Sequence, residues 1–201
     1  MENEKNYFNG IEDTKYIGKN IRENLKYCGE GVRIYPLVKL INGQNAEIDD
    51  CARLFDFTFI DAGAGLKVGK YSSITWYVLI EGGGKTSIGD RAFVGPGTKI
   101  LTSTYALNGY YTTELLPEGC QKIEYGDVII EDDAYIGANA TIFPGSIIRQ
   151  GAVVGANAFV KGELEPWTIY VGSPCKPIGK REKPTDERIK LIEDIDWNTH
   201  L

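Results

Sequence analysis

Histidine is almost absent from this 201-residue sequence, in which the only one is His200, next to the C-terminus. The four cysteines lie far apart and include no CxxC pair, so they give neither a zinc site nor a convincing disulfide framework. We therefore expect reduced thiols and no metal centre.

An excess of basic charge and long apolar runs are missing as well. The formal net charge is −6 and the pI is near 5.0, which argues against a nucleic-acid partner. No run approaches the about 18 apolar residues that a membrane span needs. The start, MENEKNYFNG, lacks the apolar core of a signal peptide. These absences predict a cytoplasmic protein with one domain.

What is present is a repeat of six. Aliphatic residues recur at this spacing in four blocks, often followed by a small residue, and Ala, Ser or Thr is common four positions later. The aliphatic positions are Ile48, Leu54, Ile60 and Leu66; Val68, Ile74 and Ile80; Ile88, Val94 and Ile100; and Ile130, Ile136, Ile142, Ile148, Val154 and Val160. A period of six predicts a coil of three short strands, with eighteen residues per turn. A sandwich would instead show a period of two.

Two segments depart from the repeat. Residues 102–126 interrupt it for 25 positions, and an insertion of this length in a compact repeat is usually functional. The stretch PTDERIKLIEDIDW predicts a short C-terminal helix with Thr185 or Asp186 as N-cap and an apolar side at Ile189, Ile192 and Ile195. We expect that helix to pack on the coil or on a neighbour. The domain then spans 1–180, with a lead-in over 1–30, and 181–201 forms a tail.

The segments IYVGSPCKPIGKR (169–181), YIGANA and VGANAF resemble the hexapeptide-repeat acyltransferases. The resemblance covers roughly residues 16–180. It implies an all-β, left-handed parallel β-helix with an excursion loop and a short C-terminal helix. It also implies a homotrimer with active sites between subunits, and acetyl-CoA as acyl donor.

The resemblance also implies a set of cofactor-binding residues. Gly137, Ala138 and Ala156 would face the pantetheine arm, where a backbone N–H could stabilise the thioester oxyanion. Basic side chains near the C-terminus suit the phosphates of coenzyme A, although a charge run by itself is more often a solvated tail. The remaining expected cofactor ligands are Lys161, Pro174, Lys176, Lys180 and Arg181, with Lys183 beside them.

A histidine general base is expected in this family near the start of the excursion, where this chain has Ser103, Thr104 and Tyr105. Transfer to a hydroxyl needs such a base, because a hydroxyl stays protonated at neutral pH. An amine on a sugar has a pKa of roughly 8, by analogy with an α-amino group, so about a tenth is already nucleophilic at pH 7. Loss of the histidine therefore costs an N-acetyltransferase less than an O-acetyltransferase.

The order WYVLIEGGGKTSIGD, ILTSTYALNGYYTTELLPE, YGDVIIEDDAYIGANATIFPGSII is similar to a branch acting on nucleotide-linked 4-amino-4,6-dideoxyhexoses in O-antigen synthesis. The resemblance implies a dTDP- or GDP-linked amino sugar as acceptor. Two alternatives stay open: a saccharide O-acetyltransferase without the usual histidine, and a non-catalytic binding or assembly protein. A carbonic anhydrase of this fold is excluded, because one histidine cannot hold its metal.

The expected active site lies where the excursion begins. Glu81 would orient the amine or accept its proton, although an exposed turn glutamate is an equally good interpretation. Ser103 and Thr104 complete the catalytic set. Trp76 and Tyr77 would stack on substrate or pack at a subunit seam. The other expected substrate-binding residues are Thr102, Tyr105, Asn108 and Tyr110.

Overall fold

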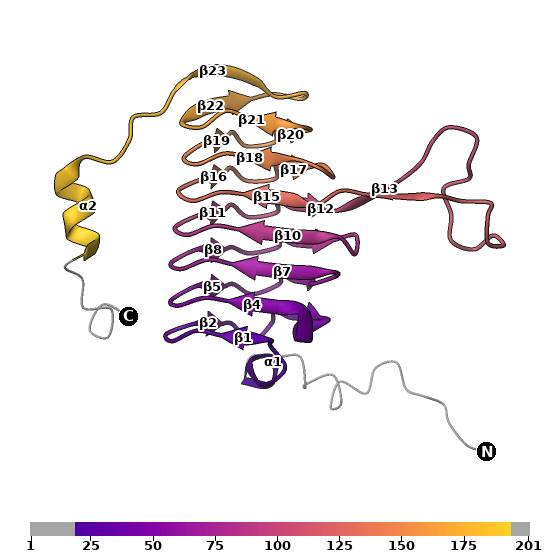
Figure 1. The fold of residues 1–201 in the computed structure, drawn as a ribbon, viewed down its shortest axis with the longest axis horizontal. Helices are drawn as coiled ribbons and strands as arrows, with labels where there is room; N and C mark the ends of the chain where they lie inside the picture. Colours follow the sequence, from indigo (N-terminus) through magenta and orange to yellow (C-terminus); the bar gives the residue numbers. More distant parts are fainter. Residues whose placement is uncertain (1–18, 194–201) are drawn as a thin grey trace.

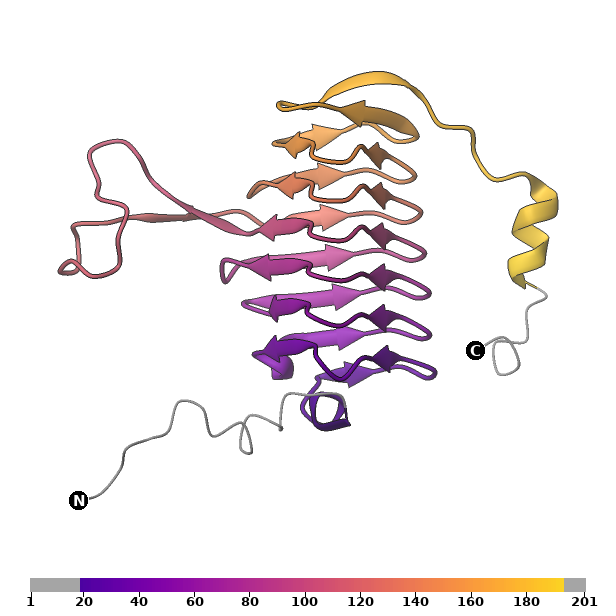
Figure 2. The ribbon, with the colours of Figure 1, turned by 180° about the vertical axis from the view of Figure 1, so that it is seen from behind.

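The computed structural model describes residues 19–193, which form a three-sided coil rising from the N-terminal to the C-terminal end (Figures 1 and 2). Each turn of the chain adds one short strand to each of three parallel sheets. The predicted β-helix is therefore confirmed.

The three sheets, named A, B and C here, follow one another around the coil. Sheet A contains β1 (Tyr27–Cys28), β4 (Ala46–Ile48), β7 (Gly65–Val68), β10 (Lys85–Ile88), β15 (Val128–Ile130), β18 (Ile147–Ile148) and β21 (Glu163–Leu164). Sheet B contains β2 (Arg33–Ile34), β5 (Arg53–Leu54), β8 (Ser73–Ile74), β11 (Phe93–Val94), β16 (Tyr135–Ile136), β19 (Val153–Val154), β22 (Thr168–Val171) and β23 (Lys176–Lys180). Sheet C contains β3 (Lys39–Ile41), β6 (Phe59–Asp61), β9 (Leu79–Glu81), β12 (Lys99–Leu101), β17 (Thr141–Ile142) and β20 (Phe159–Val160).

Three columns of turns join these sheets. The AB corner comprises 49–51, 69–71, 89–91, 131–133, 149–151 and 165–167. The BC corner comprises 35–37, 55–57, 75–77, 95–97, 137–139 and 155–157. The CA corner comprises 61–64, 81–84, 101–102, 143–145 and 161–162. Every candidate functional residue outside the excursion and the tail lies at or beside one of these corners.

The six-residue repeat builds the core. Each aliphatic position points into the coil and stacks on its counterpart one turn away, as Ile88 does between Val68 and Ile130. A fully buried side chain of this size stabilises the fold by roughly 1.5–3 kcal/mol. The small residues four positions later are buried too, and Ser72 satisfies its hydroxyl by donating to the carbonyl of Gly89 at 2.7 Å. Both predicted columns are confirmed.

The length of one turn changes along the coil. Strand partners on sheet A step by twenty residues from Cys28 to Ile48, Val68 and Ile88, and by eighteen from Ile130 to Ile148. The eighteen-residue turn predicted from the repeat is found in the C-terminal half, and the breaks between the repeat blocks lengthen the N-terminal turns to twenty. The two added residues fall in the wider glycine-containing turns of the CA corner, such as 61–64 and 81–84, and leave the inward register intact.

The excursion is an arm, residues 102–126, built on a two-stranded ribbon. β13 (Ser103–Tyr105) pairs antiparallel with β14 (Ile123–Tyr125). The backbone N–H of Gly126 donates to the carbonyl of Thr102 at 2.9 Å and closes the base of the arm. The arm projects sideways from the coil between β12 and β15 (Figure 1), and its boundaries match those expected from the sequence.

The two ends of the coil are closed differently. At the start, α1 (Lys19–Glu23) buries Ile21 in the core, and a short 3-10 helix (Gly43–Asn45) follows β3. At the top, β23 folds back antiparallel on β22. None of the helices described in 19–193 combines the length and the apolar character needed to cross a membrane.

The predicted C-terminal helix is present as α2 (Asp186–Glu193), and the N–H of Ile189 donates to the carbonyl of Thr185 at 3.0 Å. Within one chain α2 does not pack on the coil, and the expected packing on a neighbour stays a prediction. Its side chains through Ile192 are exposed, and the helix stands apart from the coil (Figure 2). Ile195 lies outside the described residues.

Candidate active site

The CA corner after β9 meets the base of the arm. Glu81 ends β9, is exposed, and pairs with Leu101 one turn above. Gly82 has φ +117°, and a Cβ there would lie 2.5 Å from the backbone nitrogen of Ser103. Only glycine fits this turn, because any side chain would push the arm away. The structure thus brings the turn after Glu81 directly against Ser103.

Thr102 supports this contact from inside. Its side chain is buried, and its hydroxyl donates to the carbonyl of Glu81 at 2.9 Å while accepting the N–H of Gly84 at 3.0 Å. Both partners belong to the turn itself. The hydroxyl therefore fixes the floor of the candidate site, and Ser103 and Glu81 are left as the groups that face outward.

Sequence reasoning missed two carboxylates on the arm, those of Glu114 and Glu124. The hydroxyl of Tyr105 donates to a carboxylate oxygen of Glu114 at 3.1 Å. Desolvation, together with this hydrogen bond, raises the pKa of Tyr105, so the phenol stays a donor at neutral pH. Glu124 lies opposite Thr104 in the ribbon. A search for acidic residues within the 102–126 insertion would have found both glutamates.

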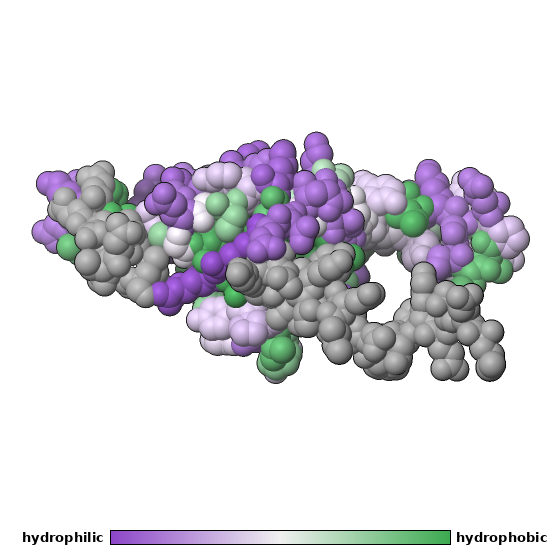
Figure 3. All heavy atoms as spheres, turned by 90° about the horizontal axis from the view of Figure 1, so that it is seen from below, coloured by the Kyte–Doolittle hydropathy of each residue, from purple (hydrophilic) through white to green (hydrophobic). Residues whose placement is uncertain are grey.

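Asn108 and Tyr110 belong to the segment of the arm that joins β13 to β14. The arm carries a large share of exposed apolar surface, visible as green atoms at its end in Figure 3. Its exposed apolar side chains are Leu107, Tyr110, Tyr111, Leu115, Leu116, Ile123 and Tyr125. The structure does not bring Asn108 or Tyr110 to Glu81 within one chain.

Trp76 and Tyr77 lie at the BC corner, at the opposite end of sheet C from Glu81. Both are exposed, and both contact aromatic rings of the turn below. Tyr77 stacks on Phe57 with ring centroids 5.1 Å apart and planes 6° apart, and Trp76 meets Phe55 at 4.7 Å. Within one chain β9 separates this corner from Glu81, and the roles expected of Trp76 and Tyr77 stay predictions.

Farther up the same corner the surface becomes narrow and small-sided. Gly137 is buried, and a Cβ there would lie 2.5 Å from the backbone nitrogen of Ala156. Ala138 is half-buried and its carbonyl accepts the N–H of Asn157 at 2.8 Å, while Ala156 is exposed. Two turns thus present backbone and methyl groups along one edge, which suits a narrow, amide-rich ligand.

The predicted cofactor ligands in the β22–β23 hairpin lie at two different corners of the coil. Pro174 follows a cis peptide bond in the turn between β22 and β23. Lys176 pairs with Val171 at the BC end of sheet B, whereas Lys180 pairs with Thr168 at the AB end. The single basic cluster expected from the sequence is therefore split.

Lys180 and Arg181 both have partners within the chain at the AB end. The ammonium of Lys180 donates to the hydroxyl of Thr168 at 2.6 Å, and Arg181 donates to the carbonyl of Asp133 at 2.6 Å. Lys161 lies at the third corner, with its ammonium 5.3 Å from the ring centroid of Phe143. Only Pro174 and Lys176 thus share the BC edge with Ala138 and Ala156.

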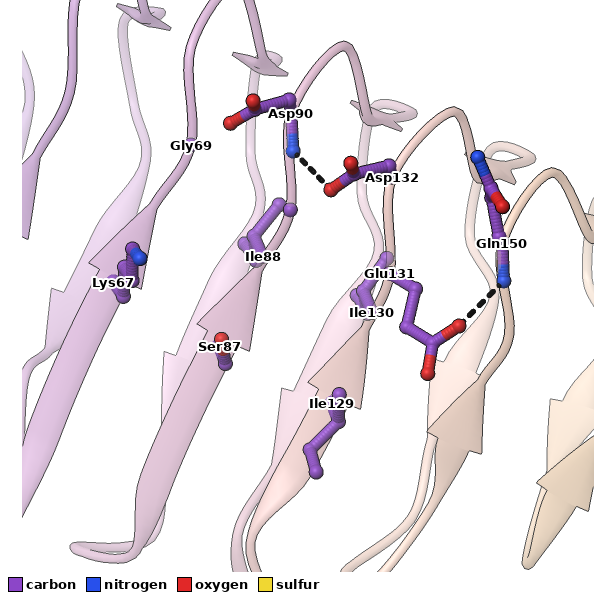
Figure 4. A pocket seen from close by; sticks show the side chains of 11 residues that line it. Lys67, Gly69, Ser87, Ile88, Asp90, Ile129, Ile130, Glu131, Asp132 and Gln150 are labelled. Atoms are coloured by element: carbon purple, nitrogen blue, oxygen red, sulfur yellow. Dashed lines mark hydrogen bonds between the residues drawn. The ribbon is translucent and has the colours of Figure 1, made fainter.

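A hollow of about 490 Å³ lies elsewhere, over the outer face of sheet A (Figure 4). Its carboxylates serve the backbone of neighbouring turns. Asp90 accepts the N–H of Lys70, Asp132 accepts that of Asp90, and Glu131 accepts that of Gln150, each at 2.8 Å. These carboxylates hold adjacent turns of the coil together. Within 19–193 no three His, Cys, Asp or Glu side chains gather as a metal site requires.

Known proteins share the repeat, the overall chain and the fold. The family model for the hexapeptide repeat of succinyl-transferase matches residues 127–161. The dTDP-4-amino-4,6-dideoxy-D-glucose acyltransferase of Escherichia coli is 32% identical over 170 residues, which cover 84% of this chain and 85% of that protein. The chain belongs to the hexapeptide-repeat acyltransferases.

Two solved structures of acyltransferases share the architecture. A variant of AntD, an N-acyltransferase from Bacillus cereus in complex with dTDP-4-amino-4,6-dideoxyglucose and coenzyme A, superposes with a TM-score of 0.76 at 26% identity. That match covers 89% of this chain and 92% of AntD. The acetyltransferase VCA0836 of Vibrio cholerae, in complex with acetyl-coenzyme A, reaches a TM-score of 0.57 at 24% identity over 82% of this chain and 75% of its own, and shows the fold alone.

Proposed function

We propose that this acyltransferase transfers an acetyl group from acetyl-CoA to the amino group of a dTDP-linked 4-amino-4,6-dideoxyhexose. The observation that carries the proposal is the 32% identity, over 84% of this chain, to an acyltransferase for such a sugar. The AntD complex, which holds that sugar and coenzyme A together, supports it. GDP is the alternative carrier.

The chemistry suits the residues at the base of the arm. The amine nitrogen attacks the thioester carbonyl, the C–N bond forms, and the C–S bond breaks to release the thiolate of coenzyme A. The amine loses one proton and the thiolate gains one, so no net acid or base is consumed. We assign Glu81 the role of orienting the amine and accepting its proton, with Ser103 and Thr104 completing the catalytic set. A sugar amine needs no histidine, because part of it is unprotonated at pH 7.

We propose that the cofactor lies along the BC edge, with Gly137, Ala138 and Ala156 along the pantetheine arm and Lys176 near the phosphates. One chain presents this edge and the Glu81 turn at different corners, so a complete site needs a second copy. The exposed apolar arm supports a homotrimer in which the arm reaches a neighbour. Asn108 and Tyr110 would then contact substrate across the subunit boundary. We further propose a cytoplasmic enzyme that supplies O-antigen or other cell-surface polysaccharide synthesis.

The test measures thiol release from acetyl-CoA with matched nucleotide sugars. The panel pairs 4-amino- and 3-amino-dideoxyhexoses with their 4-hydroxy and 3-hydroxy counterparts, each on dTDP and on GDP. We expect turnover on the dTDP-linked 4-amino sugar and none on its hydroxy counterpart. Turnover on hydroxy sugars would favour an O-acetyltransferase, and a protein that binds no coenzyme A would favour a non-catalytic role.

Glu81→Gln tests the proton acceptor in the same assay. We expect a loss of kcat of roughly tenfold to a hundredfold that shrinks as pH rises, since a larger share of the amine is then unprotonated. Glu118→Gln, an exposed arm glutamate, is the matched control and should leave kcat unchanged. Glu114→Gln decides whether the arm carboxylate is the acceptor instead. An unchanged kcat in Glu81→Gln together with a loss in Glu114→Gln would reassign the role.

A further inference from the structure

We propose that Arg181 is a positioning residue that controls acyl-CoA affinity without touching the cofactor. It forms a latch at the AB corner with Trp167, Gly151 and Asp133, and this latch holds the β22–β23 hairpin (168–180) across the top of sheet B. The hairpin in turn presents Lys176 beside the BC edge. The inference rests on the proposed function for its cofactor, and its contacts are independent of it.

The latch is made of short polar contacts. One guanidinium nitrogen of Arg181 donates to the carbonyls of Asp133 at 2.6 Å and Gly151 at 3.2 Å. Its backbone N–H donates to the carbonyl of Trp167 at 2.8 Å, and its guanidinium carbon lies 5.6 Å from the Trp167 ring centroid. Arg181 therefore ties the chain leaving β23 to three successive turns of the AB corner.

The seat of the latch is rigid. A Cβ at Gly151 would run into the ring of Trp167, so glycine lets the indole lie against the turn below. The carboxylate of Asp133 is held by Arg91 through two hydrogen bonds of 2.7 and 3.1 Å. The carbonyl that receives Arg181 is therefore fixed from below, and the tail has one defined place to attach.

The other end of the hairpin reaches the BC edge. The N–H of Phe159 donates to the carbonyl of Gly172 at 3.1 Å, and the N–H of Cys175 donates to the carbonyl of Phe159 at 2.9 Å. These bonds seat the hairpin turn directly above the turn that contains Ala156. Lys176 follows at once and is exposed.

Phosphate binding and attachment of the hairpin are assigned to opposite ends of β23. Lys176 and Lys180 lie four residues apart in an extended strand, which spans roughly 13 Å. Arg181 is one residue farther, and its guanidinium is occupied by carbonyl partners at the AB corner. Lys176 is thus placed to meet a phosphate, whereas Arg181 holds the strand that carries it.

The experiment compares Arg181→Gln with Arg188→Gln, which removes the same charge from exposed α2 of the same tail. Calorimetric titration with coenzyme A and with 3′-dephospho-coenzyme A gives the contribution of the 3′-phosphate in each protein. We expect Arg181→Gln to weaken both ligands by the same factor of roughly ten, the loss of about one charge-assisted hydrogen bond. The preference for the 3′-phosphate should stay at the wild-type value.

Steady-state kinetics and tail protection complete the test. Arg181→Gln should raise KM for acetyl-CoA about tenfold, with kcat at saturation and KM for the sugar within twofold of wild type. In Arg181→Gln, tryptophan emission should shift to the red and trypsin should cut after Lys180. In the wild type we expect that bond to be protected. Arg181→Lys keeps the charge but loses the planar fork of the guanidinium. Its KM for acetyl-CoA should lie between those of the wild type and Arg181→Gln.

Three outcomes would overturn the inference. A 3′-phosphate preference that disappears in Arg181→Gln would mean that Arg181 binds the phosphate directly. Wild-type affinity in Arg181→Gln would mean that the hairpin needs no latch. Unchanged tryptophan emission and no cleavage after Lys180 in Arg181→Gln would contradict the latch, whether or not the protein binds coenzyme A. A wild-type protein that binds no coenzyme A would instead contradict the proposed function.

Discussion

The BC corner has lower turns, at 35–37, 55–57 and 75–77, and upper turns, at 95–97, 137–139 and 155–157. The two sets have similar backbone conformations but carry different kinds of side chain. In the lower turns Tyr35 stacks on Phe55 at 4.8 Å and Phe57 stacks on Tyr77 at 5.1 Å. In the upper turns the same positions hold glycine, alanine and asparagine: Gly95, Gly97, Gly137, Ala138, Asn139, Gly155, Ala156 and Asn157. The change falls at Pro96–Gly97, the turn just below the level at which the arm leaves the coil.

The backbone explains why this difference is informative. Phe57, Tyr77, Asn139 and Asn157 all have φ between 57° and 62°. Asparagine accepts this left-handed conformation readily, whereas for an aromatic residue it costs about 1–2 kcal/mol. The lower half keeps aromatic residues in an unfavourable conformation, where ring stacking offsets the cost. The upper half uses residues that suit the turn and leave its edge uncovered.

The sharpest way to break the comparison is to place an aromatic residue in the upper half. Ala156→Trp puts an indole on the exposed edge where the cofactor is proposed to lie. We expect a loss of kcat/KM for acetyl-CoA of roughly 100-fold or more, because the ring occupies the pantetheine path, and a stability change within about 0.5 kcal/mol. Steady-state kinetics and thermal unfolding measure the two effects.

Tyr77→Trp is the control for that substitution, since it enlarges an aromatic residue in the lower half. It should leave KM for acetyl-CoA unchanged. A normal KM in Ala156→Trp would show that the cofactor does not follow this edge.

Gly137→Ala tests how closely the upper turns are packed. The new Cβ would lie 2.5 Å from the backbone nitrogen of Ala156 and 2.7 Å from the carbonyl carbon of Gly155. Because both contacts are backbone atoms, adjacent turns must separate, and we expect a loss of roughly 3 kcal/mol in the free energy of unfolding. Urea unfolding at fixed protein concentration measures it.

Gly179→Ala is the matched control, since a Cβ there meets nothing within 4 Å. Equal midpoints for the two variants would contradict the close stacking of the upper turns.

The repeat made the fold predictable from the sequence. It did not predict which corner of the coil each residue occupies. One inward aliphatic column, such as Ile74, Val94 and Ile136, specifies the coil because only a coil stacks residues at a period of six. The same pattern says nothing about which corner a residue occupies once insertions change the turn length. Trp76 and Glu81 therefore look adjacent in sequence, and the structure separates them by the length of β9.

The candidate site was predictable only where local geometry decides it. The sequence placed the expected site where the arm begins, and the structure shows there the contact between Gly82 and Ser103. The partners of Arg181 depend on the chain returning across sheet B, so the sequence could not show that its guanidinium donates to the carbonyls of Asp133 and Gly151. Glu114 was missed because its partner Tyr105 is brought near it only by the ribbon.

Tyr77→Ala and Tyr77→Asn measure the lower half. Alanine removes the stack on Phe57 and should cost about 1 kcal/mol. Asparagine removes the same stack but suits the left-handed turn, so it should recover roughly half of that loss. A stable Tyr77→Ala protein with KM for the nucleotide sugar raised tenfold would instead assign Tyr77 to the substrate, the other interpretation of the sequence.

The smallest effect concerns a thiol beside the upper half. Burial raises the pKa of Cys175, and its backbone hydrogen bond only partly opposes this. The folded protein therefore holds less thiolate than an unfolded chain at the same pH, and stability linked to this thiol is complete below about pH 8.5 and declines above it. We expect iodoacetamide to label Cys175 severalfold more slowly in the folded protein at pH 8 than in urea at the same pH, with the difference narrowing above pH 9.

Acetyl-CoA should slow labelling of Cys175 further if the cofactor lies along this edge, while Cys120 on the arm serves as the internal reference. Mass spectrometry of the labelled peptides gives both rates, and labelling of Cys175 at the rate seen in urea would show that the hairpin does not stay closed over the coil.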